Sequence, residues 1–149
     1  MAVQGLFALQ NGFIGFERSG LFFGDRSGER VQIPVCCYLI RTSDALILFD
    51  TGFSPRAVPG LVRTDPLARF TDEDLLVHRL DALDLEPADV DLVVLSHLHY
   101  DHAGGAALFH ADRDHLYRNR GRRPTELVMV VAQPDADLDE WTVGAGSTP

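Results

Sequence analysis

The 149-residue chain contains no lysine, and all 13 of its basic residues are arginine. Because aspartate and glutamate together number 22, the formal net charge is −9 at pH 7. A protein that binds a polyanion is expected to carry a basic face, so this charge argues against nucleic acid as a partner. No run reaches the roughly 18 apolar residues of a transmembrane helix, and no membrane partner is expected. The N-terminus lacks the charged start and apolar core of a signal peptide, so the expected compartment is the cytoplasm.

Cysteine is also scarce, since the sequence has only two, Cys36 and Cys37, and they are adjacent. Neighbouring residues on a strand point to opposite faces, so we do not expect these two to form a disulfide with each other. Both lie in an apolar strand pattern and no histidine is near them in sequence. We therefore expect core packing, with cysteine acting as a small hydrophobic residue, in preference to a ligand or nucleophile role.

Apolar periodicity predicts alternating strands and helices. Strands are expected over residues 6–9, 13–17, 31–42, 45–49 and 90–95. Residues 52–69 hold three prolines and show no clear period, which predicts a loop. Thr71 and Asp74 fit a variant capping box at the start of a helix. That helix has an apolar stripe up to Leu83, with His78 expected beside it at the surface. This order of elements predicts an α/β fold, in which helices form a layer on a sheet.

The segment from Ser96 to Gly105 reads Ser-His-Leu-His-Tyr-Asp-His-Ala-Gly-Gly and follows directly on an apolar strand. It holds four residues of ligand type within six positions: His97, His99, Asp101 and His102. Imidazole nitrogen and carboxylate oxygen suit zinc and its first-row neighbours, and a short loop at a sheet edge can aim several ligands at one point. The alternative interpretation is a run of solvated histidines before a helix that Asp101 caps. We interpret the pattern as a metal site.

The order His-x-His-x-Asp-His resembles the signature of the metallo-β-lactamase superfamily, and the likeness covers about Val31 to His110. A second block, from Ile33 through the turn Phe49-Asp50-Thr51-Gly52, looks most like the N-acyl homoserine lactonase branch. The resemblance implies the N-terminal half of an αββα sandwich, apparently truncated.

On the resemblance, His97 and His99 would hold one metal ion, and Asp101 with His102 a second. Two zinc ions would fill a complete site, with iron or manganese as alternatives. A hydroxide held between them would attack the carbonyl of a lactone or related ester, while Asp101 orients it and passes a proton to the leaving oxygen. Asp50 would support the metal loop and fix an imidazole tautomer without binding metal. The alternative for Asp50 is a turn aspartate bonded to its own backbone.

The chain departs from the family after His102. Family members complete the site with two more histidines and a bridging aspartate from the second half of a larger domain. Here the later histidines, His110 and His115, lack the Pro-Gly-His setting of the family, and one apolar strand candidate remains at 127–131. We therefore divide the chain into residues 1–111, the N-terminal part of the domain, and residues 112–149, a divergent tail left by truncation or a frame shift. Translating the downstream DNA in all frames tests the frame shift.

Two functions from different classes follow. The first is a zinc-dependent hydrolase acting on a small-molecule lactone or ester, acyl homoserine lactones included. The second is a non-catalytic fragment or pseudoenzyme that binds metal weakly or not at all. Three protein ligands usually anchor a catalytic zinc, whereas the motif offers two per metal, so ligand count separates the two. The sheet face on which a second half would pack predicts self-association.

Overall fold

The structure, a computed structural model, describes residues 2–110 and 126–129. One five-stranded sheet follows the order of the chain, and its strands are β1 Val3–Glu17, β2 Arg30–Thr42, β3 Leu46–Phe49, β4 Leu92–Leu95 and β5 Glu126–Met129. The pairs β1–β2 and β2–β3 are antiparallel, whereas β3–β4 and β4–β5 are parallel. The strands predicted at 31–42, 45–49 and 90–95 are confirmed with small shifts of their ends. The segment predicted at 127–131 contributes β5.

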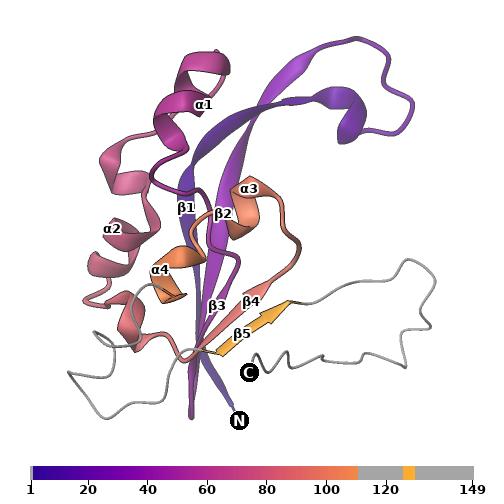
Figure 1. The fold of residues 1–149 in the computed structure, drawn as a ribbon. Coiled ribbons are helices and arrows are strands. Elements are labelled where there is room, and N and C mark those ends of the chain that lie inside the picture. The colour runs from indigo at the N-terminus through magenta and orange to yellow at the C-terminus, as the bar shows by residue number, and fades with distance from the viewer. Residues whose placement is uncertain (1, 111–125, 130–149) are drawn as a thin grey trace, which may run out of the picture.

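The helices are short: α1 Val58–Thr64, α2 Leu76–Asp81, α3 Tyr100–Ala103 and α4 Ala107–His110, with 3-10 turns η1 Arg18–Gly20, η2 Asp72–Asp74 and η3 Pro87–Asp89. Figure 1 shows α1, α2 and α4 on the same side of the sheet, which confirms the predicted layering of helices on a sheet. None of the helices in the described ranges is long and apolar enough to cross a membrane.

The strands predicted at 6–9 and 13–17 are one continuous strand, β1, so the predicted break between them, at Asn11-Gly12, is wrong. The pairing with β2 shifts register between Gln10 and Phe13, which is a β-bulge. Gly12 has φ +84°, and a Cβ there would lie 2.7 Å from the Arg69 carbonyl oxygen. Asn11 is buried, and its side-chain amide donates to the Asp74 carbonyl at 2.9 Å. A turn signature inside a long strand thus produces a bulge because the neighbouring strand continues past it.

The loop predicted over 52–69 is wrong at its centre, where α1 forms. Pro59 lies in the first turn of α1, where the missing N–H leaves no hydrogen bond unmade. Val58 and Leu61 then pack against a buried apolar cluster that includes Ile14 and Phe53. Pro55 and Pro66 therefore flank a helix that contains Pro59 in its first turn and that tertiary packing stabilises.

The capping box is confirmed: the backbone N–H and hydroxyl of Thr71 both donate to the Asp74 carboxylate, at 2.8 and 3.2 Å. The helix that follows is shorter than predicted, because Leu75 is extended with ψ 138° and separates η2 from α2. Leu76 and Leu80 of α2 are buried, whereas His78 is exposed as predicted.

The main core lies between the sheet and the helices α2 and α4. It contains Leu9, Cys37, Leu39, Leu48, Val93 and Leu95 of the sheet region, with Leu76, Leu80 and Phe109 from the helices. Cys37 is fully buried and Cys36 half-buried, and neither forms a disulfide, which confirms the packing role expected for Cys37. Burial, together with the nearby Asp50 charge, raises the pKa of the Cys37 thiol.

Candidate metal centre

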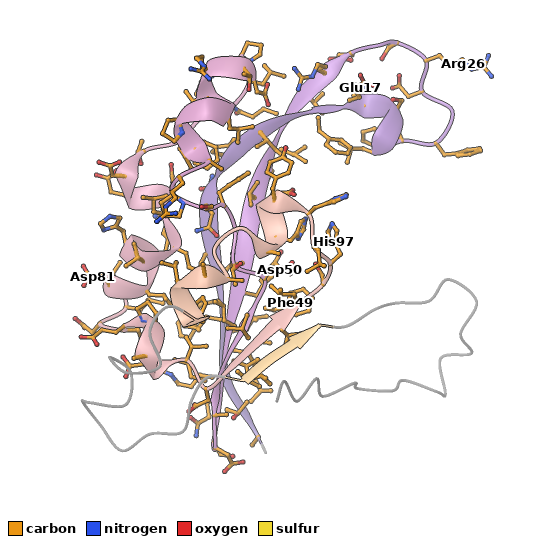
Figure 2. All side chains as sticks on the ribbon, in the orientation of Figure 1. Glu17, Arg26, Phe49, Asp50, Asp81 and His97 are labelled. Atoms are coloured by element: carbon orange, nitrogen blue, oxygen red, sulfur yellow. The ribbon has the colours of Figure 1, made fainter. Side chains whose placement is uncertain are left out.

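The centre lies where two neighbouring parallel strands end. Asp50 follows β3 and Ser96 follows β4, and the parallel register aligns Phe49 with Val94. Because parallel strands end at the same sheet edge, residues far apart in sequence meet there. The Asp50 N–H donates to the Val94 carbonyl at 2.8 Å, which extends the pairing by one residue. Figure 2 shows the labelled side chains of Asp50 and His97 at this edge.

Asp50 lies in the floor of the centre. It is only 4% exposed, and its φ of 60° is in the left-handed region that non-glycine residues seldom adopt. Its carboxylate accepts the Ser96 N–H at 2.8 Å and the Ser96 hydroxyl at 2.9 Å. The same carboxylate lies 2.8 Å from Nδ1 of His102. Asp50 is thus bonded to residues of the motif 46 and 52 positions further along the chain.

The structure brings all four predicted ligands together. The ring centroid of His97 lies 4.5 Å from that of His99 and 4.1 Å from that of His102. Oδ2 of Asp101 lies 3.4 Å from Nε2 of His102. Asp101 lies within the first turn of α3, whose N-cap residue is His99, so the interpretation of Asp101 as the cap is wrong.

The donor atoms are close without surrounding one common point. Within residues 2–110 and 126–129, no group of three or more histidine, cysteine or acidic side chains is arranged to hold an ion. The donor atoms of Asp101 and His102 nevertheless fit a metal ion chemically. With Nδ1–H donated to Asp50, Nε2 of His102 presents a lone pair to the Asp101 carboxylate, and two such acceptors favour a cation between them. Imidazole and carboxylate are the donors that zinc and its neighbours accept.

The motif is held against the Asp-Thr-Gly turn by close backbone contacts. The Thr51 N–H donates to the His102 carbonyl at 2.6 Å, and the Gly105 N–H donates to the Gly52 carbonyl at 3.1 Å. A Cβ added at Gly105 would collide with the Thr51 carbonyl oxygen, and one added at Gly104 with the Tyr100 carbonyl oxygen. Glycine at both positions therefore allows the turn between α3 and α4 to pack on residues 51–54.

Tyr100 lies at the rim and is more than half exposed. Its ring centroid is 5.7 Å from that of Phe53. Partial burial and the charges of Asp101 and Asp65 raise the pKa of its hydroxyl, so the phenol stays protonated at neutral pH.

Two hydroxyl residues of the centre were not identified from the sequence. The Ser96 hydroxyl lies 3.0 Å from Nδ1 of His97 in addition to its bonds with Asp50. Thr51 is fully buried, and its hydroxyl donates to the His102 carbonyl at 2.9 Å. Only their positions in the sequence could have indicated them, since Ser96 and Thr51 each lie within two residues of the end of a strand that reaches this edge. Of the later histidines, His110 ends α4, and His115 lies outside the described residues, as does most of the tail predicted at 112–149.

Comparison with known proteins gives consistent matches. The family pattern of the metallo-β-lactamase superfamily matches residues 31–141. This range continues past residue 111, the boundary at which the sequence analysis divides the chain. An N-acyl homoserine lactonase of a Bacillus species is 36% identical over 116 residues, which cover 73% of this chain and 46% of the relative. The N-acyl homoserine lactonase AiiA of Bacillus thuringiensis subsp. kurstaki is 35% identical with the same coverage.

A solved structure gives the same result. It is an N-acyl homoserine lactone hydrolase with the product N-hexanoyl-L-homoserine bound at its catalytic metal center, and it aligns with a TM-score of 0.65 and 34% identity. The alignment covers 73% of this chain and 46% of that structure. The chain thus spans about half the length of the curated relatives it matches.

Proposed function

The chain belongs to the metallo-β-lactamase superfamily, and from that premise we propose that it carries part of the metal centre of a hydrolase that opens acyl homoserine lactones or related esters. One observation carries the proposal: three imidazole rings and a carboxylate gather at the end of β4, above the buried Asp50. The lactone specificity is supported by the relatives, which are N-acyl homoserine lactonases at about 35% identity.

The roles follow from the donor chemistry. His97 and His99 would hold one ion, and Asp101 with His102 a second, with zinc the first choice and iron or manganese compatible with the same donors. When bound, the ions would lower the pKa of water and polarise the substrate carbonyl.

The chain's own carboxylates divide the remaining work. Asp101, whose side chain is 17% exposed, takes the proton of the attacking water and delivers it to the ring oxygen as the acyl C–O bond breaks. One water is consumed, and the products carry one new carboxyl and one new hydroxyl group. Asp50 keeps the ring of His102 in place through Nδ1.

The ligand count favours a second candidate, a fragment or pseudoenzyme that hydrolyses nothing. The described part of the chain offers two predicted ligands per ion, and no three of its side chains are arranged to hold one. A catalytic zinc usually has three protein ligands. The two candidates therefore differ in the metal retained by the chain.

The test is metal content followed by hydrolysis. The purified 149-residue protein is exposed to zinc and loosely held metal is removed. Zinc per chain is then measured by elemental analysis, and hydrolysis of N-hexanoyl homoserine lactone by proton release. Close to two ions per chain, together with hydrolysis above the buffer rate, would support the lactonase. Asp101→Asn should lower that rate about 100-fold or more.

His99→Ala should lose metal, whereas His78→Ala, which removes an exposed histidine on α2, is the matched control and should not. No retained metal and no hydrolysis would support the second candidate. Retained metal without lactone hydrolysis would keep the metal centre and overturn the lactonase assignment.

A further inference from the structure

The Ser96 hydroxyl lies between three functional side chains. Its oxygen is 2.9 Å from each carboxylate oxygen of Asp50, 3.0 Å from Nδ1 of His97 and 3.3 Å from Nδ1 of His102. The Ser96 backbone N–H also donates to Asp50, so the residue is held at both ends. The hydroxyl therefore has more neighbours than its single hydrogen can serve.

Counting protons assigns each bond. An ionised carboxylate only accepts hydrogen bonds, so the Ser96 hydrogen is directed at Asp50, which as an anion is a stronger acceptor than a neutral imidazole. The lone pairs of the Ser96 oxygen are then free to accept, and the group beside them at 3.0 Å is Nδ1 of His97. That bond requires a hydrogen on Nδ1 of His97. Nε2 of His97 is then unprotonated, and its lone pair is available to bind a metal ion.

His102 reaches the same state by a direct route. Its Nδ1 lies 2.8 Å from Oδ2 of Asp50, closer than to the Ser96 oxygen, so its hydrogen goes to the carboxylate. The Asp50 carboxylate thus orients both rings. It acts on His102 directly and on His97 through the Ser96 hydroxyl.

We propose that Ser96 is a positioning residue that links Asp50 to His97 through two hydrogen bonds, so that one buried carboxylate fixes the tautomers of two histidines. The inference rests on the proposed function, in which both rings bind metal. Its consequence is that Nε2 of His97 and of His102 carry lone pairs before any metal arrives. The chain then spends less free energy on selecting a tautomer when it binds, and outer contacts of this kind commonly change metal affinity about 10–100-fold.

The first test reads the tautomers without metal. Two-bond ¹H–¹⁵N spectra of the metal-free 149-residue protein, labelled at histidine, distinguish Nδ1–H from Nε2–H rings, and single His→Gln variants assign them. We expect His97 and His102 as Nδ1–H in the wild type. In Ser96→Ala, His97 should revert to the mixture of tautomers of a solvated ring, while His102 stays Nδ1–H. Ser96→Thr, which keeps the hydroxyl, should restore the His97 signal.

The second test measures zinc affinity by competition with a chromophoric chelator. Ser96→Ala should weaken it about 10–100-fold and Ser96→Thr should recover most of the loss. Ser19→Ala, which removes an exposed hydroxyl in η1, is the matched control. If Ser96→Ala does not fold, Ser96→Cys replaces it, because a thiol is a weak acceptor. A His97 ring that stays Nδ1–H without the hydroxyl, or an unchanged affinity, would overturn the proposal. A wild type with the expected tautomers and no metal binding would overturn only the proposed function.

Discussion

Two features of Asp50 cost free energy that a surface aspartate does not spend: its carboxylate is buried, and its backbone is in the left-handed region. Aspartate and asparagine adopt that region more readily than other side chains except glycine. Only the charge, however, explains why Ser96 and His102 direct three hydrogen bonds to it. The backbone conformation and the charge of Asp50 can therefore be tested separately.

Asp50→Asn keeps the size and the backbone preference and removes the charge. We expect zinc affinity to fall about 10–100-fold, because the amide cannot accept at all of its former positions. The measurement is chelator competition, with urea unfolding to confirm that the variant is folded. Asp81→Asn, at the exposed end of α2, is the control. An affinity equal to that of the wild type would remove Asp50 from the centre.

At this scale the sequence predicted the side chains with distinctive chemistry and missed those without it. His97, His99, Asp101 and His102 stand out because their spacing is unusual, and the structure gathers them. A serine or threonine is common in any sequence. The role of Ser96 depends on which groups of β3 and β4 it meets, and only the tertiary structure supplies those neighbours.

At the scale of elements, the turn between α3 and α4 holds the metal loop against the Asp-Thr-Gly turn. Gly105 is buried and approaches the Thr51 backbone too closely for a side chain. The contact leaves no flexible neighbour that could move aside, because the obstructing atom is a backbone carbonyl.

Gly105→Ala should therefore destabilise the fold by about 1–3 kcal/mol, the usual range for overpacking. Gly60→Ala is the matched control, because a Cβ at Gly60 in α1 meets nothing within 4 Å. Alanine in a helix should be neutral or stabilising by about 0.5–1 kcal/mol. Urea unfolding of both variants checks the pair, and equal effects would show that the turn is not closely packed.

Asp65, just after α1, joins that helix to the long hairpin. It accepts the N–H of Gly15 at 2.7 Å and of Leu67 at 3.1 Å, and lies 3.3 Å from the Arg30 guanidinium. Burial opposes ionisation of Asp65, yet these two hydrogen bonds and Arg30 together lower its pKa. A lowered pKa means that the carboxylate stabilises the folded state above its ordinary pKa, and that this contribution is lost as the pH falls.

Asp65→Asn should consequently reduce stability by about 1–3 kcal/mol at neutral pH, with the difference shrinking below about pH 4. Urea unfolding at several pH values measures it. Arg30→Gln, which removes the cation and keeps both N–H donors, should have a smaller effect. A difference between Asp65→Asn and wild type that is constant with pH would show that the charge contributes nothing.

The elements themselves were predicted where apolar periodicity and pairing agree, as in β2, β3 and β4. The failures in β1 and over residues 52–69 have one cause. Asn11-Gly12 and the prolines of residues 52–69 are local signals, and contacts with distant segments overrode them: β2 continued β1 past the bulge, and Ile14 and Phe53 gave α1 a surface to pack on.

At the scale of the whole molecule, the sheet has two unequal faces. One is covered by the helices. On the other, Leu6 pairs with Ile40 and Ala8 with Tyr38, so these four side chains share a face. Leu6 is 65% and Tyr38 41% exposed. The chain also spans 46% of the length of the lactonases it matches. An apolar sheet face of this kind favours association, so the self-association expected from the sequence stays a prediction.

Sedimentation velocity over a range of protein concentrations should therefore show the 149-residue chain associating as concentration rises. The double variant Leu6→Glu, Tyr38→Glu should remain monomeric with unchanged circular dichroism, because charges on the open face repel a second copy. Leu21→Glu is the matched control, since Leu21 is 46% exposed but lies in the β1–β2 connection away from this face. It should associate like the wild type. A wild type that is monomeric throughout, or a Leu21 variant that dissociates equally, would exclude the open sheet face as the contact surface.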